Sequence, residues 1–317
     1  MTELPLAVPP PRSHRVAFLG TPPAAVPTLA AVVAAGFEVP LVVSQPDRRR
    51  GRRSRLSPSP VKAAALDLGL EVSHDPYDLI GLDVDLGVVV AYGRLLRRDL
   101  LEQVALLNVH FSILPRWRGA APVERAILAG DATTGVCIMR ITEGLDEGPV
   151  YRCVETPIAE NESAASLTAR LADLGAELLV DVLSAPLPEP VPQTGEATIA
   201  AKIDRSANEL DFSLPAVELH RRVRIGRAWT VFRSERIGIE ETRVVDADAT
   251  GAAMAGSGRP GRLSTTADAD GGRSVVVDAG DGTFLRLITV KPAGRRAMPA
   301  IDWWNGAHPV EGERLGR

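Results

Sequence analysis

The chain is poor in several residue types that mark particular protein classes. Aromatic residues make up 4% of its 317 residues, too few for the stacking platforms that bind single-stranded nucleic acid. Its two cysteines, Cys137 and Cys153, fit neither a disulfide framework nor a metal site. No apolar run approaches membrane-spanning length, and the start lacks the layout of a signal peptide. We therefore expect a cytoplasmic protein with no metal and no membrane segment.

What is present is typical of a globular protein. Hydrophobic residues make up 45% of the chain and charged residues 24%, enough to build a sizeable core. The length suggests two domains. The net charge of −4 argues against a surface that coats nucleic acid generally, so any such contact has to come from a local basic cluster.

The first half alternates apolar runs with helical patterns. Apolar strands separated by helices are typical of a parallel sheet that is covered on both faces. We therefore expect an α/β, Rossmann-like catalytic domain over residues 14–184, after a flexible tail at residues 1–13. The predicted strands are residues 15–20, 39–44, 86–92 and 106–111, and the predicted helices are 24–35, 61–68 and 94–105.

The second half differs from the first in its composition and in its pattern of predicted elements. Residues 185–200 are rich in proline and read as a linker. After one helical stretch at 214–223, the remaining pattern predicts only strands and turns, including a hairpin with Asp281-Gly282 at or near its turn. We expect a smaller, β-rich and barrel-like domain over residues 201–317.

Two polar residues lie near the end of the predicted strand at residues 106–111. Residues two apart share one face of a strand, so Asn108 and His110 should project together while Val109 points the other way. The end of a strand in such a sheet is where ligands bind. Beyond it, Gly119 permits a tight turn and Pro122 suits the first position of a helix.

A carboxylate follows another apolar run. Asp146 lies in a turn directly after the predicted strand at residues 135–141. Amide, imidazole and carboxylate groups from two strand-end loops make a catalytic constellation.

The first strand-to-helix turn holds only Gly20, where a dinucleotide-binding turn needs three glycines, so NAD binding there is disfavoured.

The stretch from Leu106 to Asp131, LLNVHFSILPRWRGAAPVERAILAGD, resembles the active-site signature of the folate-dependent formyltransferases. The likeness is greatest to the branch that formylates methionine on initiator tRNA. FLGTP, VVVAYG and DWWNG carry the same resemblance, which spans nearly the whole chain. It implies 10-formyltetrahydrofolate as the donor, an oligonucleotide-fold-like (OB-fold-like) barrel as the second domain, and a monomer.

The resemblance also implies roles for individual residues. Asn108 would stabilise the oxyanion of a tetrahedral intermediate, and His110 and Asp146 would collect the proton of the attacking amine. No metal is needed. The implied tetrahydrofolate site comprises Val90, Ala91 and Tyr92, whose backbone would flank the pterin, and Ser112, Ile113, Leu114 and Pro115.

One segment is strongly basic. Residues 47–55 hold six arginines in nine positions, and basic side chains neutralise phosphates. A solvated charged loop is the plainer interpretation. In the resembled family this loop contacts the acceptor end of initiator tRNA, which implies tRNA binding by Arg48, Arg50, Arg52, Arg53 and Arg55.

Three alternatives stay open at this point. The chain could be another folate-dependent formyltransferase that acts on a nucleotide-linked amino sugar, or a formylfolate hydrolase. It could also be a non-catalytic tRNA-binding protein on the same scaffold.

One segment departs from the family pattern. Glu147-Gly148-Pro149 follows Asp146, where the resembled family usually has Thr-Gly-Asp.

Overall fold

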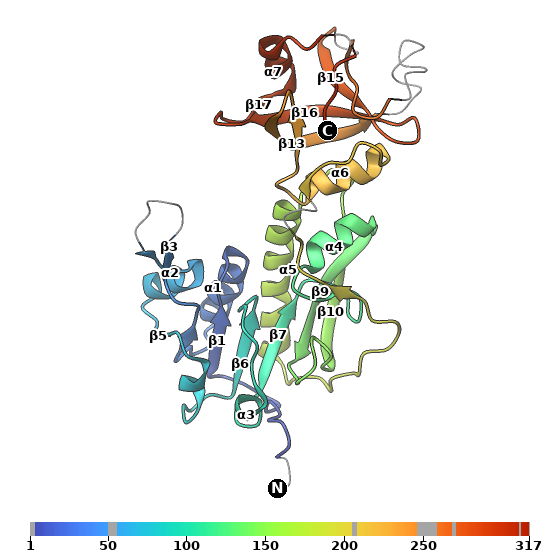
Figure 1. The fold of residues 1–317 in the computed structure, drawn as a ribbon. Helices are drawn as coiled ribbons and strands as arrows, with labels where there is room; N and C mark the ends of the chain where they lie inside the picture. Colours follow the sequence, from blue (N-terminus) through green and yellow to red (C-terminus); the bar gives the residue numbers. More distant parts are fainter. Residues whose placement is uncertain are drawn as a thin grey trace. The chain divides into compact units, whose positions relative to one another are not determined.

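The computed structural model describes residues 4–49, 56–204, 208–245, 259–267, 271–310 and 312–316. The chain forms two compact units (Figure 1). The first comprises Met1–Val123, Ala132–Ile158 and Ser166–Ala201, and the second comprises Glu124–Asp131, Ala159–Ala165 and Lys202–Arg317.

The first unit is built on a seven-stranded sheet in the order β10-β9-β7-β6-β1-β2-β5. From β7 to β5 all neighbours are parallel, whereas β9 is antiparallel to β7 and β10 is antiparallel to β9. The strands are β1 (Val16–Gly20), β2 (Val42–Val43), β5 (Val72–Ser73), β6 (Leu86–Val90), β7 (Leu106–His110), β9 (Thr133–Arg140) and β10 (Val150–Pro157).

Two short strand pairs lie outside this sheet. They are β3 (Arg48–Arg49) with β4 (Leu56–Ser57), and β8 (Arg118–Gly119) with β11 (Ile199–Ala200). The helices of this part of the chain are η1 (Pro23–Ala25), α1 (Val26–Ala34), α2 (Pro60–Asp67), η2 (Pro76–Leu79), α3 (Arg98–Leu101), α4 (Pro122–Ala129) and α5 (Ala164–Ser184).

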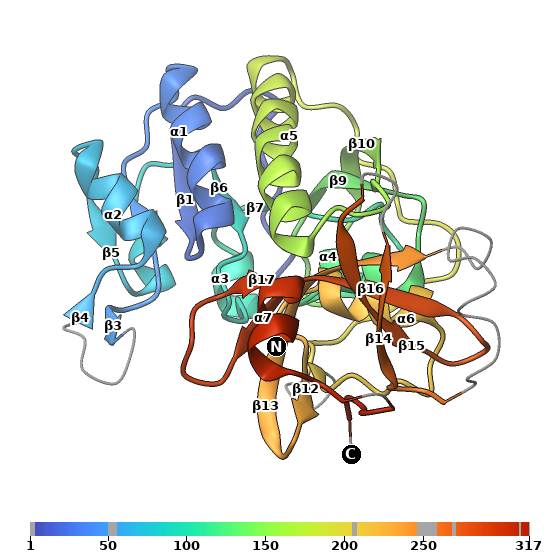
Figure 2. The ribbon, with the colours of Figure 1, turned by 90° about the horizontal axis from the view of Figure 1, so that it is seen from above.

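Helices shield the apolar strands of the sheet from solvent. All residues of β1 and β6 are buried, and α2, α1 and α5 lie in one row beside the sheet (Figure 2). Helix α5 approaches closely because Gly175 faces β7: a Cβ there would lie 2.8 Å from Val109 Cγ1. The predicted Rossmann-like α/β architecture is confirmed, with two antiparallel strands added at one edge.

One predicted helix is much shorter than expected. The pattern at residues 94–105 yields only the four residues of α3. Leu96, Leu100 and Val104 are nevertheless all buried in one cluster. The apolar spacing therefore reports the burial of an irregular segment, which periodicity alone does not distinguish from a helix.

The second unit is an antiparallel sheet in the order β12-β13-β16-β15-β14, with β17 paired to β16. Asp281 and Gly282 both have positive φ, 56° and 68°, which is the turn that a two-residue hairpin requires. The predicted hairpin is confirmed. The elements are α6 (Ala216–Arg224), β12 (Trp229–Phe232), β13 (Glu235–Val245), β14 (Leu263–Ala267), β15 (Arg273–Asp278), β16 (Phe284–Pro292), β17 (Met298–Pro299) and α7 (Ala300–Ala307).

The C-terminal residues join the two edges of this sheet. Leu315 N donates to Gly261 O at 2.8 Å beside the start of β14, and Gly316 N donates to Val231 O of β12 at 2.9 Å. The segment thus pairs with both edge strands, which makes the unit barrel-like.

Helix α7 contradicts the expectation of only strands and turns after residue 223. It carries Trp303, which is 7% exposed and meets Phe232 edge to face at 5.1 Å between ring centroids. Its N-cap is Pro299, with no side-chain cap hydrogen bond. The helix is short and lacks the usual start signals, so the sequence pattern did not indicate it.

The segment that holds Leu315 and Gly316 and pairs with both edge strands yields a stability prediction. Leu315 is 3% exposed and belongs to the core of the second unit, so Leu315→Ala should lower the free energy of unfolding by about 2–5 kcal/mol. Val310→Ala is the matched control, because that side chain is 66% exposed. Denaturant unfolding followed by tryptophan fluorescence reports mainly on this unit, which holds Trp229, Trp303 and Trp304. Equal midpoints for the two variants would contradict the closing role.

Candidate active site

Asn108 and His110 lie at the carboxyl end of β7, on one face of the sheet. Val109 between them points to the opposite face, where it packs against Gly175 of α5. His110 is 5% exposed, and Asn108 is partly buried. The alternation expected from the sequence thus places the amide and the imidazole together.

The structure brings Asp146 to the same place. Asp146 Oδ2 accepts a hydrogen bond from Gly119 N at 2.8 Å and lies 3.6 Å from His110 Nδ1. Asn108 Nδ2 donates to Asp146 Oδ1 at 3.4 Å. The strong contact is the one to the Gly119 amide, and the two side-chain contacts are long, as catalytic contacts often are before a substrate binds.

The route by which Asp146 arrives differs from the sequence expectation. Strand β9 is antiparallel to β7, and its last residue, Arg140, pairs with Leu107 near the start of β7. A loop directly after β9 therefore begins beside the amino end of β7, whereas His110 lies at its carboxyl end. Residues 141–149 return along β7, and Pro149 O accepts a hydrogen bond from Arg140 N at 2.9 Å. Asp146, within this return, has φ of 50°, which lies in the left-handed region.

Gly148 is required by the same return. A Cβ at this position would collide with the Arg140 carbonyl. Glycine is the one residue that lets the two backbone segments approach so closely. The Glu147-Gly148-Pro149 sequence thus fits the loop that carries Asp146.

The hydrogen bonds of His110 define where a proton can sit. His110 Nε2 lies 2.9 Å from Trp117 O, and because a carbonyl only accepts, Nε2 carries hydrogen. Nδ1 then faces the Asp146 carboxylate, which also only accepts when ionised. A proton received at this pair would lie between Nδ1 and Oδ2.

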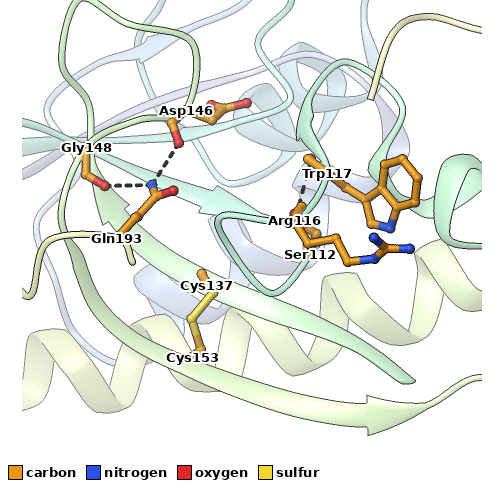
Figure 3. Close-up of a disulfide and its surroundings, with 8 residues drawn as sticks. All are labelled: Ser112, Arg116, Trp117, Cys137, Asp146, Gly148, Cys153 and Gln193. Atoms are coloured by element: carbon orange, nitrogen blue, oxygen red, sulfur yellow. Dashed lines mark hydrogen bonds between the residues drawn. A yellow bond between two sulfur atoms is a disulfide. The ribbon is translucent and has the colours of Figure 1, made fainter. Parts of the chain in front are cut away.

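Residues 112–121, called the arch below, follow β7. Ser112 Oγ donates to Arg116 O at 2.6 Å, and Trp117 and Gly119 have φ of 63° and 118° (Figure 3). Ser112 is fully buried, so its hydroxyl serves the arch instead of an open surface. The predicted helix start at Pro122 is confirmed by α4.

The other residues expected at a folate site lie near the carboxyl ends of β6 and β7. Ala91 is exposed and has φ of 46°, which turns the chain sharply after Val90. Tyr92 is buried, its carbonyl accepts from Thr21 Oγ1 at 2.9 Å, and burial raises the pKa of its hydroxyl, which stays neutral. In the arch, Ile113 and Pro115 are partly exposed, whereas Leu114 is buried.

The arginine-rich segment begins as a hairpin. It follows β2 at the sheet edge where the parallel strands β1, β6 and β7 also end, and β3 pairs antiparallel with β4. Arg48 and Arg49 are exposed. An ion pair of 2.8 Å between Asp47 and Lys62 ties the base of this hairpin to α2. Arg50, Arg52, Arg53 and Arg55 lie outside the described residues.

Residues 185–200, expected to be a linker, lie within the first unit. Strand β11 pairs with β8 of the arch, and Thr198 Oγ1 accepts a hydrogen bond from Trp117 N at 2.8 Å. Two further arch amides donate to Ala200 O. Residues 193–200, called the strap below, therefore hold the arch. Composition gave no signal of this, because most of these bonds use backbone groups.

The two cysteines form a disulfide, which corrects the sequence expectation (Figure 3). Cys137 of β9 and Cys153 of β10 lie directly opposite each other in the antiparallel pair. Cysteine counting missed this because adjacency came from strand pairing, which the sequence spacing does not reveal. Cys137 is buried and pairs on its other side with His110 in the strand register.

Among the described residues, no group of three or more His, Cys, Asp or Glu side chains is arranged to hold a metal ion. None of the helices in the described ranges combines the length and the apolar character needed to cross a bilayer.

Two family models together match most of the chain. The model described as formyl transferase matches residues 14–183, and the model described as formyl transferase, C-terminal domain, matches residues 202–308.

Relatives match along nearly their whole length. The methionyl-tRNA formyltransferase of Halorhodospira halophila is 45% identical over 316 residues, which cover 94% of this chain and 98% of the relative. The methionyl-tRNA formyltransferase of Thermus thermophilus is 41% identical over 319 residues, with 96% and 99% covered. Among solved structures, a sugar 3N-formyl transferase has a TM-score of 0.63 at 14% identity and covers 90% of this chain and 100% of that chain. This last likeness shows the fold.

The disulfide makes a second stability prediction. Cys137 and Cys153 are 16 residues apart, and closing a loop of that length stabilises a protein by about 3 kcal/mol. Cys153→Ser should therefore lower the thermal midpoint by several degrees, and a reductant should lower the midpoint of the unmodified protein equally. The variant is its own control, since reductant should leave its midpoint unchanged. Two titratable thiols in the denatured, unreduced protein would refute the bond.

Proposed function

The chain belongs to the formyl transferase family, and we propose on that basis that it transfers the formyl group of 10-formyltetrahydrofolate to the α-amine of methionine on initiator tRNA. The observation that carries this proposal is the convergence of Asn108, His110 and Asp146 at the carboxyl end of β7. Their groups suit acyl transfer to an amine. The full-length similarity to methionyl-tRNA formyltransferases supports that acceptor.

The chemistry needs no covalent enzyme intermediate. The methionine nitrogen attacks the formyl carbon, and the carbonyl oxygen becomes an oxyanion while the amine becomes positively charged. An amide N–H of Asn108 donates to that oxyanion, a contribution of about 3 kcal/mol to the transition state. The bond from carbon to the folate nitrogen then breaks, and this nitrogen takes up a proton as tetrahydrofolate leaves.

His110 and Asp146 move the proton between the two nitrogens. The attacking amine has to lose one proton and the leaving nitrogen has to gain one, so the net count is zero. The site between His110 Nδ1 and Asp146 Oδ2, 3.6 Å apart, can hold that proton in transit. The Nε2 contact to Trp117 O fixes the ring so that Nδ1 is the nitrogen presented.

The donor would lie against the residues around this centre. Its reacting nitrogen has to lie beside Asn108, and the exposed turn at Ala91 with the partly exposed Ile113 and Pro115 borders the same end of the sheet. Val90, Tyr92 and Leu114 would shape this surface from within. Ser112 would contribute by holding the arch through its bond to Arg116 O.

The acceptor would be held by its phosphates. Arg48 is exposed in the hairpin at the sheet edge where β7 also ends, and Arg50, Arg52, Arg53 and Arg55 extend the same basic segment. Each phosphate neutralised makes binding more salt-dependent. A nucleotide-linked amino sugar has too few phosphates to contact a basic segment of this length. The fold shared with a sugar formyl transferase does not favour that substrate.

The remaining assignments follow from this proposal. Residues 14–184 would carry catalysis and residues 201–317 would bind tRNA, with residues 185–200 joining them. The protein would act as a cytoplasmic monomer.

The first test is direct. The purified protein, 10-formyltetrahydrofolate and methionine-charged initiator tRNA should yield formylmethionyl-tRNA in equal amount to the tetrahydrofolate released. Charged elongator tRNA and a nucleotide-linked amino sugar are the acceptor controls. Absence of product with substrates shown to be active would refute the proposal, product on the sugar would favour the alternative, and tetrahydrofolate without formylated acceptor would indicate hydrolysis.

Catalysis and acceptor binding should separate by mutation. Asn108→Ala should lower kcat by about 100-fold or more and leave tRNA affinity nearly unchanged. Arg52→Ala should weaken tRNA use and reduce the slope of log affinity against log salt by about one. Arg152→Ala is the charge-matched control. Arg152 is exposed on β10, the outer strand on the side of the sheet away from β2 and the basic segment. Steady-state kinetics across a salt series measure both, and equal effects of Arg52 and Arg152 would remove the assigned role of the basic segment.

A further inference from the structure

Gln193 of the strap makes an unusually complete set of hydrogen bonds. Its Nε2 donates to Asp146 O and to Gly148 O, both at 2.8 Å. Its Oε1 accepts from Arg118 Nε at 3.0 Å and from Arg118 Nη2 at 2.8 Å. Both donors of the amide and its acceptor oxygen are thus engaged, and Figure 3 shows the amide nitrogen between the two carbonyls.

These partners belong to the two segments that form the active site. Asp146 and Gly148 lie in the loop that returns along β7, and Arg118 lies in the arch. The same two segments meet directly through the bond from Gly119 N to Asp146 Oδ2. Gln193 therefore provides a second connection, on the backbone side of Asp146, between the loop and the arch.

The loop needs such a connection. Asp146 holds φ of 50°, a conformation that costs about 1 kcal/mol or more for a residue with a side chain. The Gly119 amide holds the end of its carboxylate at 2.8 Å, whereas the contacts to Asn108 and His110, at 3.4 and 3.6 Å, are long. A bond at its backbone therefore adds a constraint that the side-chain contacts do not supply. With its carbonyl fixed by Gln193, the peptide plane and hence the direction of the carboxylate are constrained.

We infer that Gln193 is a positioning residue for the formyl transfer, acting through the backbone of Asp146 to aim its carboxylate at His110. This inference rests on the proposed function for its reaction, but its contacts do not depend on the acceptor. A misplacement of about 1 Å at a catalytic group can cost 100-fold in rate. Loss of Gln193 should therefore appear in kcat.

Two variants isolate the donated hydrogen bonds. Gln193→Ala removes the whole amide, whereas Gln193→Glu keeps the shape and the acceptor for Arg118 and loses the donors. The two share the loss of donation to Asp146 O and Gly148 O. Both should lower kcat by about 10- to 100-fold, with KM for each substrate within about threefold. Glu196→Ala, an exposed residue of the same strap, is the control and should keep wild-type kcat.

A double-mutant cycle distinguishes positioning from a general structural role. If Gln193 acts through Asp146, then adding Gln193→Ala to Asp146→Asn should lower kcat less than about threefold further, because residues that work as a unit are not additive. A merely structural effect would multiply the two losses. Thermal midpoints of all variants are measured alongside to establish that they fold.

The outcomes separate this inference from the function on which it rests. No formylation by the wild-type protein would overturn the proposed function. Wild-type formylation with unchanged kcat in both Gln193 variants would overturn the positioning role alone, as would multiplicative losses in the cycle. Low kcat in Gln193→Ala with normal kcat in Gln193→Glu would assign the effect to Arg118 and also overturn it.

Discussion

The hydrogen bond from the Gly119 amide to the Asp146 carboxylate is the contact on which the geometry of the candidate active site depends. At 2.8 Å it is the strong bond among the contacts that converge on that carboxylate. It joins two loops that leave the sheet from neighbouring strands. Gly119 can offer its amide because its φ of 118° is accessible to glycine. The backbone of Asp146, with φ of 50°, is held by the Gly119 amide at its carboxylate and by Gln193 at its carbonyl.

The direction of one strand explains the shape of the loop. Since β9 runs antiparallel to β7, the chain leaves β9 at the end of β7 that is distant from His110. It has to return before the Asp146 carboxylate can approach His110. This return requires a left-handed residue at Asp146 and a glycine at Gly148. Gln193 of the strap then donates to two carbonyls of the returned loop, so this residue does more than join two parts of the chain.

Much of the fold could be predicted from local patterns. The helix start at Pro122 and the hairpin turn at Asp281-Gly282 depend on backbone preferences of the residues themselves. The shared face of Asn108 and His110 depends on the period of a strand. By contrast, the disulfide of Cys137 with Cys153 depends on which strands become neighbours, and helix α7 depends on Trp303 reaching Phe232. Long-range pairing of this kind leaves no trace in local spacing.

The sequence by itself therefore determined the α/β and β-rich halves, the position of Asn108 and His110 at a strand end, and the family. These follow from residue preferences that act over a few positions or from a motif that is contiguous in the chain. Only the tertiary structure decided the approach of His110 Nδ1 to Asp146, the inward turn of Ser112 and the hydrogen bonds of Gln193. Each depends on hydrogen bonds between segments separated along the chain, whose geometry is set when strand directions and loop paths are fixed by packing.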